Sequence, residues 1–300
     1  MGSYAGRVGL VTGGGRGLGR AHALALAGRG MAVVVNDTGA AGDGTGPDPA
    51  VAQRVVDEIN AAGGHAFASA HDVSTHEGAA AAVRVALDEC GRLDAVVNNA
   101  GILRDRTFAK MTLDDFDAVV GVHLGGSAYV THAAWPALCE SGSGRVVFTS
   151  SASGLYGQFG QANYGAAKAA MLGLVNVLKL EGRRKGVLVN GIAPVAHTRM
   201  TDPLLPEEAK PKLGPEQVSP LVAWLASEEC DQTGLMLEVA AGLVARVQVT
   251  ETETVPLAGA DGKATDVGAV VRRLTEMPPG DPYPSSDEAT SRYVSAAAGG

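Results

Sequence analysis

The 300-residue sequence has few aromatic residues, few cysteines and no excess of positive charge. Aromatic residues make up only 4% of the chain, so the 46% that is hydrophobic predicts a core built mostly of Ala, Val and Leu. The three cysteines, Cys90, Cys139 and Cys230, lie far apart and form no CxxC pair, which argues against a disulfide framework and favours a reducing compartment. A formal net charge of -8 argues against a nucleic-acid partner.

Long apolar segments and targeting signals are also missing. No apolar run approaches about 18 residues, so no membrane-spanning helix is expected. No cationic segment leads into a long apolar one at the N-terminus, and the C-terminal AAAGG is not a peroxisomal address. His65, His71 and His76 are spaced too irregularly for a metal site. We therefore expect a cytosolic protein that binds neither membrane nor metal.

What the sequence does contain is a regular alternation of short apolar runs and helical patterns. The expected strands are 7–12, 31–37, 65–72, 93–101, 144–151 and 187–194, and the expected helices are 17–30, 51–62, 75–90, 113–140 and 162–185. The strand segments are apolar on both faces, as strands covered by helices on both sides require. This alternation predicts an α/β fold with a doubly wound parallel sheet, the Rossmann fold.

Three segments lie outside the alternation. Residues 38–50 are rich in Gly, Pro and Asp and predict a loop, and residues 197–217 are rich in Pro and charge and predict a mobile flap. Residues 243–300 predict a short strand near 243–250, a helix near 266–275 and a Pro/Ser-rich end. We therefore expect one dinucleotide-binding domain, residues 1–242, and a C-terminal extension, 243–300, that contacts a partner subunit or covers the site.

A glycine-rich turn, VTGGGRGLGR, joins the first expected strand to the first expected helix. Glycines let the backbone approach a pyrophosphate, and the following helix N-terminus offers free N–H groups to it. The nucleotide-contacting residues expected here are Gly13, Arg16, Gly17, Leu18 and Gly19.

An acidic residue, Asp37, ends the second expected strand about twenty residues later. Such a carboxylate accepts the ribose hydroxyls of NAD and repels the 2′-phosphate of NADP, so we favour NAD, although an Asx turn at a strand end is the competing interpretation. Arg16 weakens this preference, because an arginine in the turn can bind a phosphate.

Tyr164 and Lys168 lie four residues apart, and residues i and i+4 share one helix face. A phenol has a pKa near 10, so it serves as a base near neutrality only if its phenolate is stabilised by about 4 kcal/mol. An ammonium one helical turn away, together with the positive nicotinamide ring of a bound dinucleotide, can supply such a field. Alone, the pair would more simply be a packed tyrosine and a solvated lysine.

The ordered set of motifs resembles the short-chain dehydrogenase/reductase family over residues 7–240. The set comprises TGxxxGxG at 12–19, Asp72, NNAG at 98–101, Ser151 and YxxxK at 164–168. Segments such as NNAGILRDRTFAKM and TSSASGLYGQFGQANYGAAK resemble the (3R)-hydroxyacyl-CoA dehydrogenase units of type 2 peroxisomal multifunctional enzymes, also described as 17β-hydroxysteroid dehydrogenase type 4.

The resemblance implies roles for further residues. Ser151 would hold the substrate oxygen, and Lys168 would also bind the nicotinamide ribose. Contacts to the cofactor are implied for Asp72, Val73, Asn99, Ala100, Gly101, Tyr164, Lys168, Pro194 and Thr198.

His123 stands where the wider family has an asparagine that helps to hold a relay water. It could take over that role, since imidazole titrates near neutrality. A buried histidine bonded to a backbone carbonyl is the alternative.

The resemblance implies an NAD-dependent (3R)-3-hydroxyacyl-CoA dehydrogenase that forms homodimers or homotetramers and takes part in fatty acid metabolism. A steroid alcohol or a sterol-side-chain CoA thioester is the alternative substrate, with residues 155–161 lining its pocket. A nucleotide-binding sensor without turnover is the alternative of another class.

Overall fold

The computed structural model describes residues 4–198, 201–202, 206–257 and 266–298. In this part of the chain eight strands form one sheet, in the order β3-β2-β1-β4-β5-β6-β7-β8. Pairing from β3 through to β7 is parallel throughout, as the sequence predicted. The strands are β1 (Val8–Thr12), β2 (Ala32–Asn36), β3 (Ala66–Ser69), β4 (Ala95–Asn98), β5 (Arg145–Thr149), β6 (Leu188–Val195), β7 (Met236–Ala240) and β8 (Leu243–Val247).

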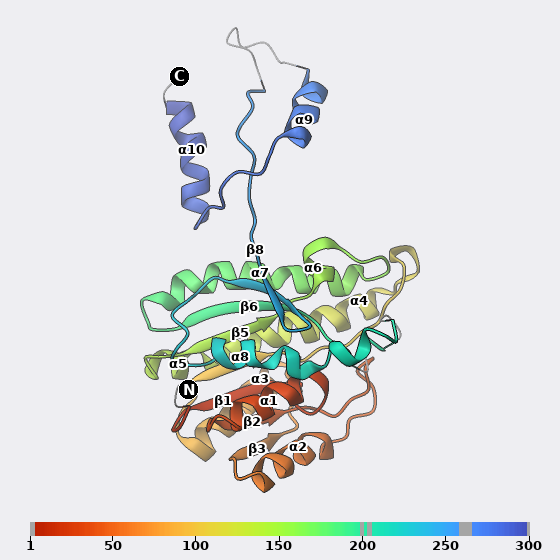
Figure 1. The fold of residues 1–300 in the computed structure, drawn as a ribbon, viewed down its shortest axis with the longest axis vertical. Helices are drawn as coiled ribbons and strands as arrows, with labels where there is room; N and C mark the ends of the chain where they lie inside the picture. The colour runs from red at the N-terminus through yellow and green to blue at the C-terminus, as the bar shows by residue number, and fades with distance from the viewer. Residues whose placement is uncertain (1–3, 199–200, 203–205, 258–265, 299–300) are drawn as a thin grey trace. The chain divides into compact units, whose positions relative to one another are not determined.

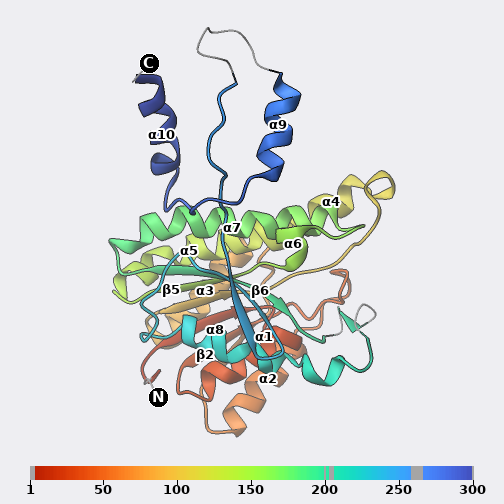
Figure 2. The ribbon, with the colours of Figure 1, turned by 45° about the horizontal axis from the view of Figure 1, so that its top comes forward.

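Helices cover both faces of this sheet, which explains why β1, β2, β4 and β5 are buried along almost their whole length, whereas the edge strand β8 is largely exposed (Figure 1). One layer holds α1 (Gly17–Ala27), α2 (Ala50–Ala61) and α8 (Ser219–Leu225), and the other holds α3 (His76–Cys90), α5 (Gly126–Glu140) and α7 (Ala162–Arg183) (Figure 2). The remaining helices and helical turns are α4 (Leu113–Val120), α6 (Ala152–Tyr156), α9 (Val267–Glu276), α10 (Ser286–Ala298), η1 (Phe108–Lys110), η2 (Gly121–Gly125), η4 (Lys210–Lys212) and η5 (Pro215–Gln217).

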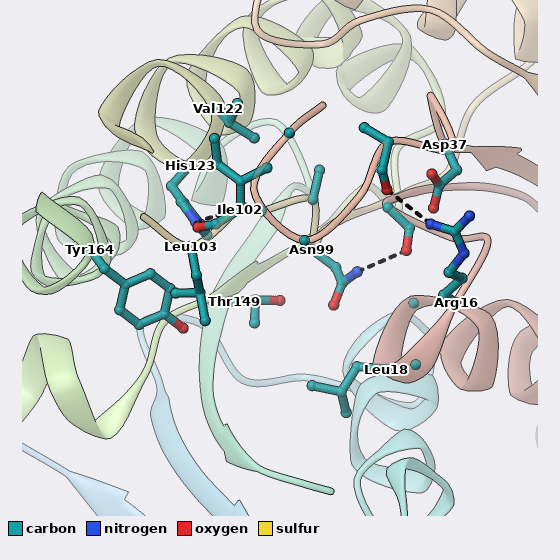
Figure 3. Close-up of a pocket in the computed structure, with 18 of the residues that line it drawn as sticks. Arg16, Leu18, Asp37, Asn99, Ile102, Leu103, Val122, His123, Thr149 and Tyr164 are labelled. Atoms are coloured by element: carbon teal, nitrogen blue, oxygen red, sulfur yellow. Dashed lines mark hydrogen bonds between the residues drawn. The ribbon is translucent and has the colours of Figure 1, made fainter. Parts of the chain in front are cut away.

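The strand order reverses between β1 and β4, which are neighbours in the sheet although β2 and β3 separate them in sequence. In parallel sheets the loops at the carboxyl ends of the strands diverge at such a point and leave a crevice. The pocket drawn in Figure 3 is lined by residues that end or follow β1, β2, β4, β5 and β6.

The expected elements are present, with three local differences. Strand β3 ends at Ser69 rather than at Asp72, because the side chain of Asn36 bonds the carbonyl of His71 and Asp72 forms an Asx turn with Ser74. The helix expected over 113–140 is interrupted by the π-helical turn η2, which separates α4 from α5. The short helix α6, which follows Ser151, was not predicted, and neither were α8 and β7, which lie in residues 218–242.

The chain divides into two compact units, residues 1–246 and 247–300. Within the second unit, α9 is the helix expected near 266–275, and its first turn is capped by Asp266, which accepts hydrogen bonds from the amides of Gly268 and Ala269. Helix α10 was not predicted, because its surroundings are rich in Pro and Ser. A role for this unit as subunit contact or site cover stays a prediction. In the described residues no helix is long and apolar enough to cross a membrane.

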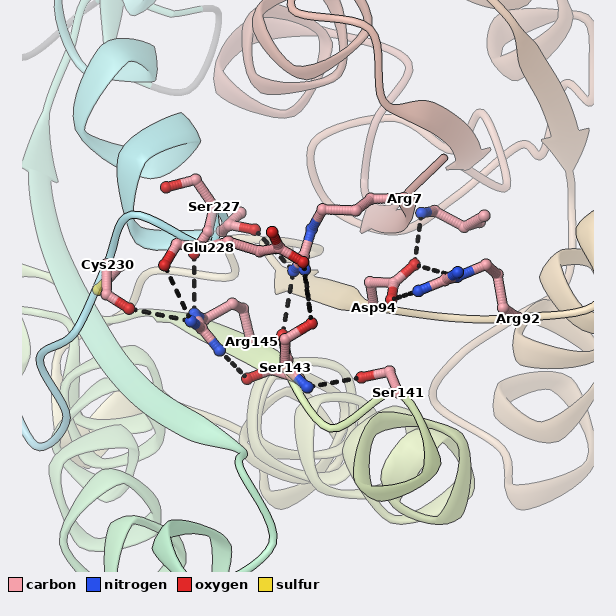
Figure 4. Close-up of polar contacts among 12 residues, drawn as sticks. Arg7, Arg92, Asp94, Ser141, Ser143, Arg145, Ser227, Glu228 and Cys230 are labelled. Carbon is pink, nitrogen blue, oxygen red and sulfur yellow. Dashed lines mark hydrogen bonds and ion pairs between the residues drawn. The ribbon is translucent and has the colours of Figure 1, made fainter. Parts of the chain in front are cut away.

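Two buried arginines fix the amino ends of the strands, at the edge opposite the pocket (Figure 4). Arg145 donates to the carbonyls of Ser227 at 2.9 Å, Gly144 at 3.0 Å and Cys230 at 3.0 Å. Arg7 donates to the carboxylate of Glu228 at 3.0 Å. These contacts tie the segment after α8 to the sheet.

Replacing Arg145 with methionine should destabilise the protein strongly. The substitution leaves buried carbonyls without a donor, which we expect to cost roughly 3 kcal/mol of unfolding free energy. The control Arg20→Met removes an exposed pair with Glu58 and should cost under about 1 kcal/mol. Denaturant unfolding measures both, and equal losses would contradict this account of the cluster.

Candidate active site

The pocket at the carboxyl edge of the sheet has a volume of about 870 Å³. This lies within the usual range of about 300–1,000 Å³ for small-molecule sites. Tyr164 and His123 lie on one side of it, Arg16 and Asp37 on the other, and Asn99 between them (Figure 3). It is lined by all the predicted site residues: Gly13, Arg16, Gly17, Leu18, Gly19, Asp37, Asp72, Val73, Asn99, Ala100, Gly101, His123, Ser151, Tyr164, Lys168, Pro194 and Thr198.

The glycine turn leaves the N-terminus of α1 available to a ligand. Arg16 is the N-cap residue, and its side chain forms no capping hydrogen bond. The first amides of α1 therefore keep the partial positive charge that binds a pyrophosphate. At Gly19 a Cβ atom would lie 2.0 Å from the carbonyl oxygen of Gly13, so only glycine fits where the turn meets the helix. These features fit a dinucleotide.

Thr12 joins the glycine turn to the end of β4. Its hydroxyl accepts hydrogen bonds from the amides of Asn99 at 3.0 Å and Ala100 at 3.1 Å, while the Asn99 side chain donates back to the Thr12 carbonyl at 3.0 Å. The sequence reasoning gave Thr12 no role of its own, although it opens the TGxxxGxG motif. The link fixes the two strand ends that form the middle of the pocket.

The carboxylate of Asp37 is held at the pocket wall by two backbone amides. It accepts from Gly15 at 2.9 Å and from Gly39 at 2.7 Å. One of these contacts is the Asx-type bond that the sequence offered as the competing interpretation. Each carboxylate oxygen keeps a further lone pair for a ribose hydroxyl.

Arg16 points toward the loop after β2. Its guanidinium donates to the carbonyls of Ala40 at 2.9 Å and Gly39 at 3.2 Å. The loop in turn lies against the segment after β4, since the carbonyl of Gly42 accepts from Leu103 at 2.8 Å. Sequence reasoning placed this Gly/Pro/Asp segment in a loop but missed its place in the pocket wall, to which it contributes Thr38, Ala40, Ala41, Gly42, Gly44 and Pro47.

Tyr164 and Lys168 share one face of α7, as their spacing predicted. The Nζ atom of Lys168 lies 5.7 Å from the centroid of the Tyr164 ring and donates to the Thr149 carbonyl at 2.6 Å. Ser151 lies close enough to Tyr164 for its hydroxyl to lower the pKa of the phenol. The three side chains assigned to catalysis therefore meet in the pocket.

Burial controls the ionisation of both groups. It raises the pKa of Tyr164, an effect that the Ser151 hydroxyl opposes and the negative charge of Asp105 reinforces. It also lowers the pKa of Lys168 to about 7. A low-dielectric pocket disfavours both charged forms. The lowering of the phenol pKa expected from Lys168 and the nicotinamide ring together stays a prediction for the cofactor-bound protein.

The two adjacent serines differ in what they contact. Ser150 is buried, and its hydroxyl donates to the Lys168 carbonyl at 2.8 Å, which secures α7 to β5. Ser151 is the N-cap residue of α6, where its oxygen accepts from the amide of Ser153 at 3.2 Å, and it also reaches Tyr164. This arrangement agrees with assigning the substrate contact to Ser151.

His123 lies in η2, where the π-helical turn directs its ring toward the site. Its imidazole meets the Tyr164 ring edge to face, with 5.1 Å between ring centroids. The ring also packs against Gly101, where a Cβ atom would lie 2.1 Å from the imidazole. Single π-helical turns are frequent at functional sites.

The hydrogen bonds of His123 show features of both interpretations that the sequence left open. Its Nε2 lies 2.8 Å from the Ile102 carbonyl and 3.1 Å from the Ile102 amide, as in a structural histidine. Its Nδ1, however, is buried without a hydrogen-bond partner among the described residues. Burial and the nearby charge of Lys168 lower the pKa of His123 well below its usual value, so the ring is neutral.

The other predicted cofactor residues also line the pocket. The carboxylate of Asp72 accepts from Ser74 at 2.9 Å, and the neighbouring Val73 is buried. Pro194 belongs to β6, and the amide of Thr198 donates to the Thr201 hydroxyl at 2.8 Å. Of the predicted flap, residues 199–200 and 203–205 lie outside the described residues.

The sequence matches the family model described as short chain dehydrogenase over residues 7–209. It is 52% identical to a short-chain type dehydrogenase/reductase of Mycobacterium tuberculosis, over 80% of this chain and 84% of that protein. It is 49% identical to peroxisomal multifunctional enzyme type 2 of Mus musculus, over 91% of this chain and 35% of that enzyme, so it spans about a third of that relative.

Two solved structures agree with these sequence matches. Full-length peroxisomal multifunctional enzyme type 2 of Drosophila melanogaster superposes with a TM-score of 0.82 at 36% identity, over 98% of this chain and 50% of that one. A 7α-hydroxysteroid dehydrogenase, complexed with NADH and 7-oxo glycochenodeoxycholic acid, gives 0.72 at 26% identity over 80% of this chain and 95% of that one.

The imidazole of His123 should stay neutral between pH 5 and 8 in the ligand-free protein. Burial disfavours its charged form, and the Lys168 ammonium repels a second positive charge. NMR of the histidine ring protons measures this, with the spectrum of His123→Asn assigning the resonance. A His123 resonance that titrates inside this range would show that the ring gains a proton there.

Proposed function

The chain belongs to the short-chain dehydrogenase family, and on that basis we propose that it oxidises the 3-hydroxyl of a (3R)-3-hydroxyacyl-CoA to a ketone with NAD. Members of this family bind NAD(P) and act on hydroxyl or keto groups, so the chain is an oxidoreductase with a small-molecule substrate. The observation that carries the proposal is the meeting of Ser151, Tyr164 and Lys168 in the pocket that contains the glycine turn.

Each of these three residues has a distinct task in alcohol oxidation. NAD, when bound, accepts the hydride. Tyr164 takes the hydroxyl proton as general base, and Ser151 donates a hydrogen bond to the substrate oxygen as its charge changes. Lys168 keeps two N–H groups beyond the one given to Thr149, which are available to a ribose hydroxyl and to the phenolate.

Because the pKa of Tyr164 is raised in the ligand-free chain, its phenolate, which is the general base, forms near neutral pH only when nearby positive charge stabilises it. Two positive charges stabilise a phenolate here: the ammonium of Lys168 and the nicotinamide ring of bound NAD. Neutral Tyr164 is the proton donor for the reverse reaction, the reduction of a ketone. The same residues thus serve both directions.

For His123 we propose a place in the path that carries the proton away from this pair. The unpartnered Nδ1 and the contact with Tyr164 support that role. A neutral ring can hold a water through Nδ1 and pass a proton without keeping it.

The preference for NAD over NADP rests on Asp37 and Arg16. The carboxylate of Asp37 lines the pocket, and the guanidinium of Arg16 is engaged by loop carbonyls. A 2′-phosphate would meet a negative charge without a free arginine to neutralise it.

Acyl-CoA is favoured over a steroid by the motif similarity to the dehydrogenase units of multifunctional enzymes. Of the segment 155–161, expected to line a steroid pocket, only the polar Gln158 and Gln161 line the cavity. Tyr156 and Phe159 are instead exposed. The steroid alternative is retained because the 7α-hydroxysteroid dehydrogenase shares the fold.

A sensor without turnover is the weaker alternative, since Tyr164 and Lys168 are both present and meet in the pocket.

We also propose a homodimer or homotetramer formed through α5 and α7. The exposed side chains of Val177 and Leu180 on α7 support this.

Replacing Tyr164 with phenylalanine should abolish oxidation while NAD still binds. Loss of the general base should lower kcat roughly 100- to 10,000-fold. The measurement is NADH formation from short and long (3R)-3-hydroxyacyl-CoA and from a free steroid alcohol, with the NAD dissociation constant as control. Turnover of none of these by the wild-type protein with NAD bound, or full turnover by Y164F, would refute the proposed function.

Replacing Asp37 with serine should shift the cofactor preference toward NADP. We expect kcat/KM for NAD to fall about 10-fold, through lost ribose hydrogen bonds, and kcat/KM for NADP to rise because the repulsion is gone. Asp43→Ser is the matched control, since it removes a loop carboxylate that does not line the pocket. Equal effects of the two variants would contradict the assignment.

A further inference from the structure

The reaction described above leaves one carboxylate near Tyr164 without a task. Asp105 follows β4, and its Oδ2 accepts a hydrogen bond from the side-chain amide of Gln161 at 2.7 Å. Gln161 is the N-cap residue of α7 and precedes Tyr164 by three positions. The side chain that holds Asp105 thus begins the helix that carries the phenol.

Backbone contacts fix this arrangement. Arg106 and Gln161 form an isolated parallel bridge, and the Arg106 amide donates to the carbonyl of Gly160 at 2.9 Å. Two positions after Gln161, the Asn163 side chain donates to the Arg104 carbonyl at 3.1 Å. The segment that carries Asp105 is therefore tied to the start of α7 on both sides of the carboxylate.

The charge of Asp105 is not neutralised by a cation. Its Oδ1 is buried without a hydrogen-bond partner, and among the described residues it forms no ion pair. Arg104 gives its guanidinium to the Asp43 carbonyl and to Asp115. Arg106 donates to the backbone carbonyl of Asp105 rather than to its carboxylate.

Within the described residues, three side chains beside Tyr164 come from the elements around it. Lys168 lies on α7, the neutral His123 in η2 and the uncharged Ser151 before α6. Asp105, held at the start of α7 through Gln161, adds a negative charge near this set of side chains. An unpaired anion in a poorly screened site opposes ionisation of a neighbouring phenol.

We infer that Asp105 is a positioning residue that disfavours the phenolate of Tyr164 and so sets the pH at which oxidation begins. Gln161 holds the carboxylate in place through a neutral amide and leaves its charge intact. The direction agrees with the raised pKa of Tyr164, to which Asp105 contributes after burial. The inference rests on the proposed function in that Tyr164 is the acid–base group.

The test is the Asp105→Asn variant, which removes the charge and keeps an oxygen that accepts from Gln161. Asp115→Asn is the matched control, because that carboxylate is paired with Arg104 at 3.3 Å and does not line the pocket. The measurement is kcat/KM for the alcohol at saturating NAD from pH 5 to 10. Each value is divided by the plateau value of kcat/KM that the same protein reaches at high pH. This quantity reports the essential base before the alcohol binds.

For D105N the rising limb should move to lower pH. At a fixed pH on that limb, its fraction of plateau should exceed that of the wild type by at least about threefold. The D115N profile should coincide with the wild-type profile. A D105N limb that stays in place, while Y164F is inactive, would overturn this inference and leave the proposed function standing.

D105N could lose activity for a reason unrelated to Tyr164. A direct measurement of the ionisation of Tyr164 tests the inference in that case as well. In ligand-free protein labelled with 13Cζ-tyrosine, the Tyr164 resonance should titrate at lower pH in D105N than in wild type. An unchanged titration in folded D105N would also overturn the inference.

Discussion

The site depends on the burial of Tyr164 and Lys168 together, one helical turn apart, against the end of β5. The hydrogen bond from Lys168 to the Thr149 carbonyl fixes the ammonium there, and burial lowers its pKa to about 7. The same burial raises the pKa of the phenol. Both charged forms are disfavoured in the empty pocket, so the bound cofactor and substrate decide which proton is lost.

The parallel topology places this pair in the same pocket as the glycine turn, because it brings segments that are distant in sequence to one edge of the sheet. Thr12 bonds the amides that follow β4, and α1 begins without a side-chain cap beside them. The glycine turn therefore faces the tyrosine across Asn99 (Figure 3). Stability is supplied mainly elsewhere, by the apolar sheet and by the buried arginines at the opposite edge.

The sequence was sufficient to predict most of the main elements and the cofactor and catalytic residues that line the pocket, but not α8, β7 or the pocket residues of the loop after β2. Strand and helix periodicity and the glycine turn are local signals, and YxxxK spacing places two side chains on one helix face. What it could not show depends on tertiary contacts. The pKa of Tyr164 is raised by burial. The contact between His123 and Gly101 arises from the packing of η2. The position of Asp105 depends on its hydrogen bond with Gln161, which lies 56 positions away in the sequence.

The central claim is that the phenol loses its proton in response to the charge of bound NAD. Linkage makes this measurable as the pH dependence of NAD affinity, since binding that promotes proton release strengthens as pH rises. Calorimetric titration of NAD from pH 6 to 9 should show a steeper increase in affinity for the wild type than for Y164F, which retains Lys168. Identical slopes for the two proteins would contradict the account.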